Sequence, residues 1–165
     1  ILKPHSILRG MVNMLILMIP PMEKESNTYS LETLPILVEQ LLLMLKETKV
    51  LELHGEMGAG KTTLVIELLK KLGVKDPEGS PTYSLINEYP IANGLKIYHI
   101  DAFRINSSEE AYELGLDELF EENAYFFVEW AEKIINFLPE RSVILTITTN
   151  ASLTRTYSIT HDHRS

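Results

Sequence analysis

Short apolar runs alternate with segments of helical periodicity through most of the chain. Short, mostly apolar runs, which are typical of buried strands, cover Lys49–Leu53, Lys96–Ile100 and Ala124–Val128, and the last of these is apolar throughout. Apolar residues recur with helical spacing over Thr62–Leu72, and a further helix is expected between a Ser107 N-cap and Gly115. Strands that alternate with helices predict an α/β fold with a mostly parallel central sheet and helices on both faces.

Further elements are expected on either side of this alternating region. Near the start, Ser30 is expected to cap a helix whose apolar face runs from Ile36 to Leu45. Near the end, Arg141–Thr149 and Thr154–Thr160 indicate two strands of a hairpin, which we expect to add antiparallel edge strands. Weaker patterns predict a strand at Tyr83–Tyr89 and a short helix at Trp130–Phe137.

The first 21 residues are set apart from this pattern. A charged start and the apolar run Met11–Ile19 resemble a signal peptide, but no small-x-small cleavage site follows and the run is too short to span a bilayer. Met22 is an equally good start. We therefore expect residues 1–21 to be an N-terminal extension outside the fold and residues 22–165 to form a single domain.

Charge and cysteine content exclude several classes of function. The formal net charge of the chain is −8. Such a charge argues against nucleic-acid or membrane binding through a broad basic surface, while it is compatible with a basic protein partner. The chain has no cysteine, which excludes disulfides, thiolate metal sites and a cysteine nucleophile and is compatible with a cytoplasmic protein.

A glycine-rich loop follows the first of the apolar runs. Its sequence, HGEMGAGKTT at residues 54–63, fits the pattern G-x-x-x-x-G-K-S/T in full and lies between a predicted strand and a predicted helix. In that context the loop amides face phosphates, Lys61 reaches the β- and γ-phosphates, and the Thr62 hydroxyl binds Mg²⁺. We therefore predict that ATP is bound by Gly55, Glu56, Met57, Gly58, Ala59, Gly60, Lys61, Thr62 and Thr63.

Two of the predicted strands run directly into a carboxylate. Asp101 follows Ile97–Ile100, and Glu129 follows Tyr125–Val128. Ligands of open parallel sheets bind beyond the carboxyl ends of the strands, where the glycine loop also lies. The alternative is that both acids merely begin exposed loops. We predict catalytic roles for Lys61, Asp101 and Glu129, and a Mg²⁺ site formed by Thr62, Asp101 and Glu129.

Other residues near these motifs allow more than one interpretation. The segment Ser80–Thr82 is either a switch-like loop whose hydroxyls, including that of Thr82, approach the γ-phosphate or Mg²⁺, or a simple turn. Trp130 is expected to be a packing residue. His54 and His99 are expected to be strand residues near the site rather than metal ligands, because no His/Asp cluster with ligand spacing accompanies them.

Five motifs in this order resemble the bacterial TsaE family, also called YjeE. They are GEMGAGKTT, SPTY, YHIDAFR, ELGLDELF and VEW, and the resemblance covers about residues 28–160. Three departures from the usual family pattern are Glu56 in place of aspartate, Met57 in place of leucine, and Ala102-Phe103 where Leu-Tyr is common. The last of these removes a hydroxyl, so no role for that hydroxyl carries over.

The resemblance implies a specific activity. Members of the family are small P-loop ATPases needed for N6-threonylcarbamoyladenosine at position 37 of tRNA (t6A37). The resemblance implies binding to TsaB and TsaD, a functional link to TsaC, only indirect contact with tRNA, and low intrinsic activity without partners. By position, Lys61 and Thr62 match the phosphate and Mg²⁺ residues, Asp101 a Walker-B-like aspartate, Glu129 a metal-site glutamate, and Thr33 and Arg155 residues near the nucleotide pocket.

Other functions of a P-loop fold are alternatives to this one. A small-molecule kinase would need an acceptor pocket and usually a lid with several arginines, whereas Arg104, Arg141 and Arg155 are dispersed. An interaction module that holds ATP without hydrolysing it would not need Lys61 together with both acids, but hydrolysis data are needed to exclude it. A GTPase would carry an N-K-x-D element, which the sequence lacks.

Overall fold

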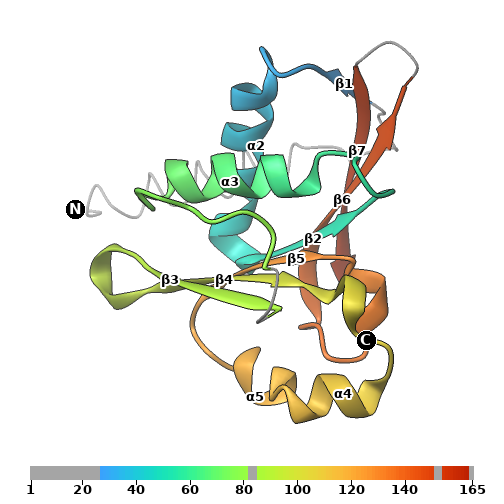
Figure 1. Cartoon of the computed structure of the whole chain (residues 1–165). Coiled ribbons are helices and arrows are strands. Elements are labelled where there is room, and N and C mark those ends of the chain that lie inside the picture. Colours follow the sequence, from blue (N-terminus) through green and yellow to red (C-terminus); the bar gives the residue numbers. More distant parts are fainter. Residues whose placement is uncertain (1–26, 82–84, 151–153, 164–165) are drawn as a thin grey trace, which may run out of the picture.

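The computed structural model describes residues 27–81, 85–150 and 154–163, and a single seven-stranded sheet organises this part of the chain. Residues 1–21, expected to lie outside the fold, fall outside the described residues. The strands are β1 (Asn27–Tyr29), β2 (Val50–His54), β3 (Ile86–Pro90), β4 (Lys96–Asp101), β5 (Tyr125–Glu129), β6 (Arg141–Thr149) and β7 (Arg155–His163). Their order across the sheet is β1-β7-β6-β2-β5-β4-β3 (Figure 1).

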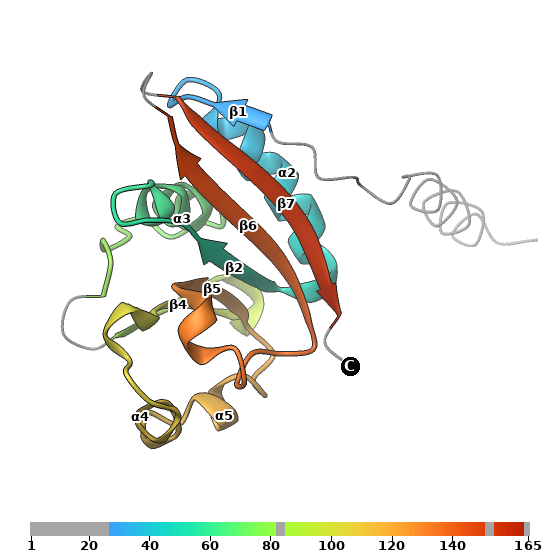
Figure 2. The same ribbon diagram turned by 90° about the vertical axis from the view of Figure 1, so that its right-hand side faces the viewer.

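The sheet is mixed, with its parallel strands in the centre. Strand β2 pairs in parallel with β5 and β6, and β4 pairs in parallel with β5. Antiparallel strands flank this centre on both sides: β3 pairs with β4, and β7 pairs with β6 and β1. The long β6–β7 hairpin is prominent in Figure 2. The predicted parallel centre and late antiparallel hairpin are therefore present, and an antiparallel strand also lies at the opposite edge.

Helices cover both faces of the sheet, as predicted. Helices α2 (Leu34–Thr48) and α3 (Lys61–Lys71) lie on one face. The opposite face carries α4 (Ser108–Glu113), α5 (Leu116–Leu119) and the short 3₁₀ helix η3 (Ala131–Ile134). Two further 3₁₀ turns, η1 (Ala92–Gly94) and η2 (Ala102–Arg104), follow β3 and β4. Figure 1 shows the two helical layers above and below the strands.

Alternation along the central strands creates two apolar cores. Leu51 and Leu53 of β2 point to the α2–α3 layer, whereas Val50 points to the opposite layer. On β5, Phe127 joins the first core and Phe126 the second. Burial of each such side chain contributes about 1.5–3 kcal/mol to stability relative to exposure. The sheet is therefore fixed on both faces, and the ends of its central strands are held in place.

The first helix begins later than its sequence suggested. Ser30 does not cap it; α2 begins at Leu34 and its N-cap position is Thr33, whose side chain makes no capping hydrogen bond. A proline in the first turn, Pro35, lacks an N–H group and so reduces the number of amides that need a cap. The carbonyl of Ser30 instead accepts hydrogen bonds from the amides of Thr33 and Leu34.

Some other elements also differ from the predictions. Strand β3 begins at Ile86, and the first residues of the predicted strand at Tyr83–Tyr89 lie outside the described residues. The helix predicted at Trp130–Phe137 is the 3₁₀ turn η3, which is shorter. The three-residue strand β1 was not predicted at all. Within the described ranges, no helix combines the length and the apolar character needed to cross a membrane.

Candidate functional site

A cavity of about 340 Å³ lies at the carboxyl ends of β2, β4 and β5. The glycine loop separates β2 from α3 at this edge, and the last residues of β4 and β5 are the two predicted acids. The predicted site residues that line the cavity are Met57, Gly58, Gly60, Lys61, Thr62, Thr63, Asp101, Glu129 and Arg155. The fold thus brings together residues that are up to about a hundred positions apart in the sequence.

Two glycines of the loop are required by its backbone geometry. Gly55 has φ +147°, and a Cβ atom at this position would lie 2.5 Å from the carbonyl oxygen of Ile147 in β6. Gly60 has φ +100°, and a Cβ there would lie 3.0 Å from Nε of Arg155. Side chains at these positions would clash or be strained, so the loop conformation depends on glycine.

The lysine of the loop is buried and held in place by three groups. Its Nζ atom donates hydrogen bonds to the carbonyl oxygens of Gly55 (2.6 Å) and Glu56 (2.9 Å). The same atom lies 4.2 Å from the centroid of the Trp130 ring, a cation–π distance. Lys61 is 4% exposed. The ammonium group is therefore held between the backbone carbonyls of the loop and the Trp130 ring.

Burial also affects the protonation of this lysine. Loss of hydration lowers the pKa of Lys61 from its ordinary value of 10.5, while the negative charges of Glu129, Glu132 and Asp101 oppose this shift. The three acids are therefore close enough to stabilise the cation. A ligand that brings more negative charge into the cavity would favour the protonated form further.

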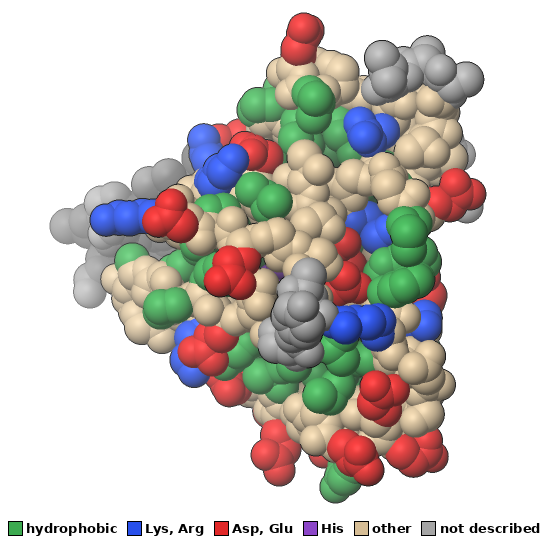
Figure 3. Space-filling model, in the orientation of Figure 1, with side chains coloured by type: hydrophobic (Ala, Val, Ile, Leu, Met, Phe, Trp, Pro, Cys, Tyr) green, Lys and Arg blue, Asp and Glu red, His purple; other side chains and the backbone are tan. Residues whose placement is uncertain are grey.

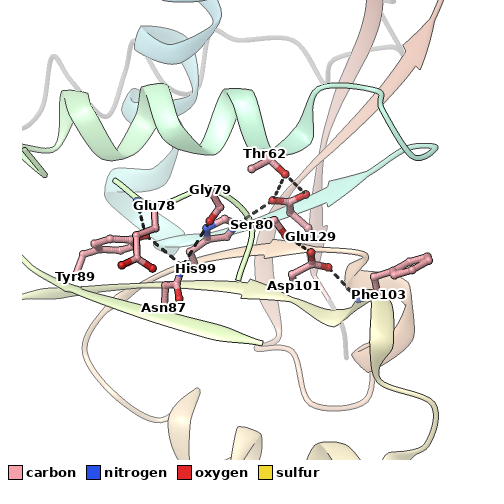
Figure 4. A network of polar contacts seen from close by, with 10 residues as sticks. All are labelled: Thr62, Glu78, Gly79, Ser80, Asn87, Tyr89, His99, Asp101, Phe103 and Glu129. Carbon is pink, nitrogen blue, oxygen red and sulfur yellow. Dashed lines mark hydrogen bonds and ion pairs between the residues drawn. The ribbon is translucent and has the colours of Figure 1, made fainter. Parts of the chain in front are cut away.

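The two acids at the strand ends lie side by side on one face of the sheet. Asp101 and Glu129 are register partners on the neighbouring parallel strands β4 and β5. Two carboxylates in such positions repel each other unless a cation or hydrogen bonds compensate for their charges. Their side chains share the face against which α3 packs, so the first turn of that helix lies next to them (Figure 4).

Glu129 is the acid that contacts the glycine loop's helix. The hydroxyl of Thr62 donates to its Oε1 and Oε2 atoms, each at 2.9 Å. The Nε2 atom of His99 lies 2.8 Å from Oε1. With only 3% of its surface exposed, this carboxylate is held by side chains from α3 and β4 (Figure 4).

Asp101 has a different set of partners. Its Oδ1 atom accepts a hydrogen bond from the backbone amide of Phe103 at 3.0 Å, and its Oδ2 atom accepts one from the hydroxyl of Ser80. Ser80 also lines the cavity. This arrangement favours the interpretation of the serine segment as part of the site. Thr82, which was predicted to bind the nucleotide, lies outside the described residues.

The donor set suits a hard divalent cation that also takes ligands from a nucleotide. Thr62, Asp101 and Glu129 present oxygen atoms, which Mg²⁺ prefers. Within the described ranges, no cluster of three or more His, Cys, Asp or Glu side chains forms a metal cage. Mg²⁺ usually binds through one or two carboxylates together with phosphates and waters, so the residues present fit it.

The two residues assigned by resemblance alone lie in different places. Arg155, the first residue of β7, donates from Nε to the carbonyl oxygen of Ala59 at 2.7 Å and lines the cavity. Thr33 does not line the cavity; its hydroxyl bonds with the backbone N and O atoms of Ser30 at 2.9 and 3.3 Å. The structure thus connects Arg155 to the glycine loop and leaves a nucleotide contact of Thr33 as a prediction.

Two aromatic residues at the cavity were missed by sequence reasoning. Trp130, expected only to pack, lines the cavity beside Lys61, and its ring centroid lies 5.0 Å from that of Phe103. The backbone of Trp130 has φ +57°, a conformation that non-glycine residues rarely adopt and that is common at functional sites. Its position immediately after Glu129 was the available signal, because it places the ring at the same edge of the sheet.

The two histidines occupy different environments. His99 is fully buried and contacts Glu129. His54 lies between two acids, with Nε2 3.4 Å from Oε2 of Glu52 and Nδ1 3.2 Å from Oε2 of Glu132. Of the two, only His99 is attached to a residue that lines the cavity.

Comparison with known families agrees with this geometry. The sequence model of the family described as "Threonylcarbamoyl adenosine biosynthesis protein TsaE" matches residues 28–157. The chain belongs to the TsaE family. The match includes the glycine loop, both acids and Arg155.

Individual relatives support the family assignment. The chain is 38% identical over 110 residues to the tRNA threonylcarbamoyladenosine biosynthesis protein TsaE of Haemophilus influenzae, covering 66% of this chain and 69% of that protein. It is 37% identical over 114 residues to the TsaE of Aquifex aeolicus, covering 68% of this chain and 75% of the relative. The TsaE of Bacillus subtilis is 38% identical over 102 residues, which are 62% of this chain and 63% of that protein.

A solved structure has a similar fold. The crystal structure of Bacillus subtilis YdiB matches with a TM-score of 0.61 and 25% sequence identity, covering 86% of this chain and 88% of that chain. The structural similarity therefore extends over most of the α/β fold, beyond the segment around the glycine loop.

Proposed function

We propose that this chain binds ATP with Mg²⁺ and hydrolyses ATP in support of t6A37 synthesis on tRNA. One observation carries the proposal: Thr62, next to the phosphate-loop lysine, donates its hydroxyl hydrogen to Glu129 at the end of the adjacent strand. A phosphate loop alone is compatible with simple nucleotide binding. A loop whose threonine is joined to a buried carboxylate also provides a place for the metal ion that phosphoryl transfer needs.

The charged and hydroxyl side chains from the glycine loop and the two strand ends each have a role in this proposal. Lys61 exchanges its carbonyl contacts for phosphate oxygens, and the loop amides and glycines hold the phosphates close to the backbone. Thr62 and Glu129 hold Mg²⁺, which neutralises charge on the phosphoryl oxygens when bound. Asp101, which holds Ser80, orients the attacking water from the neighbouring strand end.

The different partners of the two acids lead us to assign them different roles. Glu129 touches Thr62 directly, whereas Asp101 contacts Ser80 and a backbone amide. Because Thr62 and Glu129 are in contact, these two residues together would hold a metal ion, and Glu129 would supply the carboxylate oxygen. We propose direct or water-mediated metal binding by Glu129 and positioning of water by Asp101.

The names of the relatives suggest the biological process. Because those proteins are named for tRNA threonylcarbamoyladenosine biosynthesis, we propose that this chain acts in the cytoplasm with TsaB and TsaD, and with a functional link to TsaC. Contact with tRNA is proposed to be indirect. In support, exposed acidic side chains gather over α4 and α5, a surface that would repel nucleic acid (Figure 3).

A reconstitution with purified proteins tests the proposal. The full chain is mixed with TsaB and TsaD, with and without ATP and Mg²⁺, and retention on tagged TsaB is measured together with phosphate release and t6A formation in the presence of TsaC and tRNA. We expect retention, hydrolysis that rises in the complex, and repeated turnovers of t6A formation. No retention and no effect on t6A turnover would contradict the assignment.

The same reconstitution separates the two other candidate functions. A small-molecule kinase would transfer phosphate to an acceptor without any dependence on TsaB and TsaD. An interaction module that only holds ATP would be retained in the complex without releasing phosphate. Thin-layer chromatography of labelled ATP products, run on the same samples, distinguishes the three results.

A further inference from the structure

A fully buried histidine stands behind the proposed metal-site glutamate. His99, in the middle of β4, has 0% of its surface exposed, and its Nε2 atom lies 2.8 Å from Oε1 of Glu129. Its other ring nitrogen, Nδ1, is buried and has no hydrogen-bond partner in the described part of the chain. Figure 4 shows the imidazole reaching from β4 to the carboxylate.

A histidine at this position is energetically unfavourable if its side chain only fills the core. Its neighbours Ile97 and Ile100 are fully buried apolar residues, and an apolar side chain would fill the same place without leaving a buried nitrogen unpaired. Among the residues that the structure describes, the imidazole has one polar contact, which is with Glu129. The polar function of the ring is therefore its contact with the Glu129 carboxylate.

The contact restricts how the carboxylate of Glu129 can turn. A carboxylate that binds a metal ion only accepts hydrogen bonds, so in the proposed site Nε2 of His99 would be the donor. Oε1 is then held both by His99 and by the Thr62 hydroxyl, whereas Oε2 has the Thr62 contact alone. Of the two oxygens, Oε2 is the one with more capacity left for a further ligand.

We propose that His99 is a positioning residue that fixes the rotation of the Glu129 carboxylate, so that Oε2 remains available beside Thr62 for a divalent cation. The proposal rests on the proposed function, because it assigns Glu129 to metal binding. Carboxylates that bind metal ions are commonly hydrogen-bonded in turn by outer partners, which orient them. His99 itself touches neither nucleotide nor metal in this arrangement.

Two variants of the full chain separate positioning from packing. His99→Phe keeps a ring of similar size but removes the donor, and His99→Gln restores an N–H donor on a flexible chain. We expect His99→Phe to weaken the binding of Mn²⁺, used as a paramagnetic probe, by about tenfold or more in the presence of a non-hydrolysable ATP analogue. In the same variant, nucleotide affinity measured in EDTA and the KM for ATP should stay within about twofold of the wild type, whereas kcat should fall at least tenfold. His99→Gln should recover most of the lost Mn²⁺ affinity and most of the lost kcat.

Two results would overturn the proposal. One is an unchanged Mn²⁺ affinity in His99→Phe, and the other is a His99→Gln variant whose Mn²⁺ affinity and kcat are no higher than those of His99→Phe. If the wild-type chain itself bound neither nucleotide nor Mn²⁺, the proposed function would fail. Crystal structures of the variants would still test the positioning role. The Glu129 carboxylate should lose its contact with Thr62 in His99→Phe and keep it in His99→Gln.

A measurement on the wild-type chain covers the case in which His99→Phe does not fold. With ¹⁵N-labelled histidine, NMR should identify a proton on Nε2 of His99, and its resonance should move in Glu129→Gln, which keeps the shape but not the charge of the acceptor. A proton on Nδ1 instead, or no change in Glu129→Gln, would contradict the contact on which the proposal depends.

Discussion

The hydroxyl oxygen of Thr62 lies 2.9 Å from both carboxylate oxygens of Glu129, although 67 positions separate the two residues in the sequence. This pair joins the first turn of α3 to the end of β5 at a single point. Asp101, the register partner of Glu129, makes no such contact in the described structure and is bonded to Ser80 instead. Substitutions at the two acids should therefore affect different steps.

Removal of either acid should separate ATP binding from hydrolysis. Loss of a negative charge beside a polyanion does not weaken binding by itself, but loss of metal or water placement slows phosphoryl transfer. We expect Glu129→Ala and Asp101→Ala to keep ATP affinity and lose most hydrolysis, with a raised Mg²⁺ requirement for Glu129→Ala. Calorimetry and phosphate release measure these effects, with the exposed Glu121→Ala as control. Wild-type hydrolysis by Glu129→Ala in the assembled complex would refute the metal role.

Removal of the loop lysine should weaken the binding of ATP. Charge-assisted contacts of an ammonium group with phosphate contribute about 1.5–3 kcal/mol each. We expect Lys61→Ala to weaken ATP binding at least about tenfold, which corresponds to about 1.4 kcal/mol. Lys71→Ala, at the exposed end of the same helix, is the matched control and should bind as the wild type does. Unchanged affinity of Lys61→Ala in calorimetry would exclude the phosphate contact.

A substitution in the glycine loop should destabilise the chain through its backbone. In Gly55→Ala the new Cβ would lie 2.5 Å from the carbonyl oxygen of Ile147, at a φ of +147°. Strain of this kind costs about 1–3 kcal/mol. Urea unfolding should show this loss, whereas Gly79→Ala, where a Cβ meets nothing within 4 Å, should change little. Equal stability of the two variants would show that the loop relaxes without cost.

The buried lysine should make stability depend on alkaline pH. Burial lowers the pKa of Lys61 below 10.5, so its charge is less favourable in the folded than in the unfolded chain. This penalty is fully present below the lowered pKa and disappears as the pH rises toward 10.5. The free energy of unfolding of the wild type should therefore rise relative to that of Lys61→Met as the pH increases from neutral toward 10.5. Urea unfolding at several pH values checks this, and a constant difference would contradict it.

The parts of the site that could be predicted are local in sequence or follow from strand direction. The glycine loop has a continuous pattern between a strand and a helix, and Asp101 and Glu129 end parallel strands that must finish at one edge. The predicted α/β fold, parallel centre and two helical layers followed from the same periodicity. Binding of ATP and Mg²⁺ by these residues stays a prediction that the variants above test.

The parts that could not be predicted depend on tertiary geometry. The role of His99 follows from a diagonal contact between two strands, which no local pattern encodes. Trp130 reaches the cavity because its backbone takes a left-handed conformation that sequence rules assign to glycine. Strand β1 has three residues and exists because β7 offers an edge to pair with. Ser30 was a plausible cap, but the proline in the first turn of α2 changed where the helix begins.

The contact between Arg155 and the carbonyl of Ala59 spans 96 positions of the sequence. The glycine loop also packs against Ile147, so the late hairpin supports it from behind. A ribosome that has synthesised only the loop, α3 and both acids has therefore not yet produced the strand and arginine against which the loop rests. The loop therefore gains this support only after the chemical groups of the proposed site have already emerged.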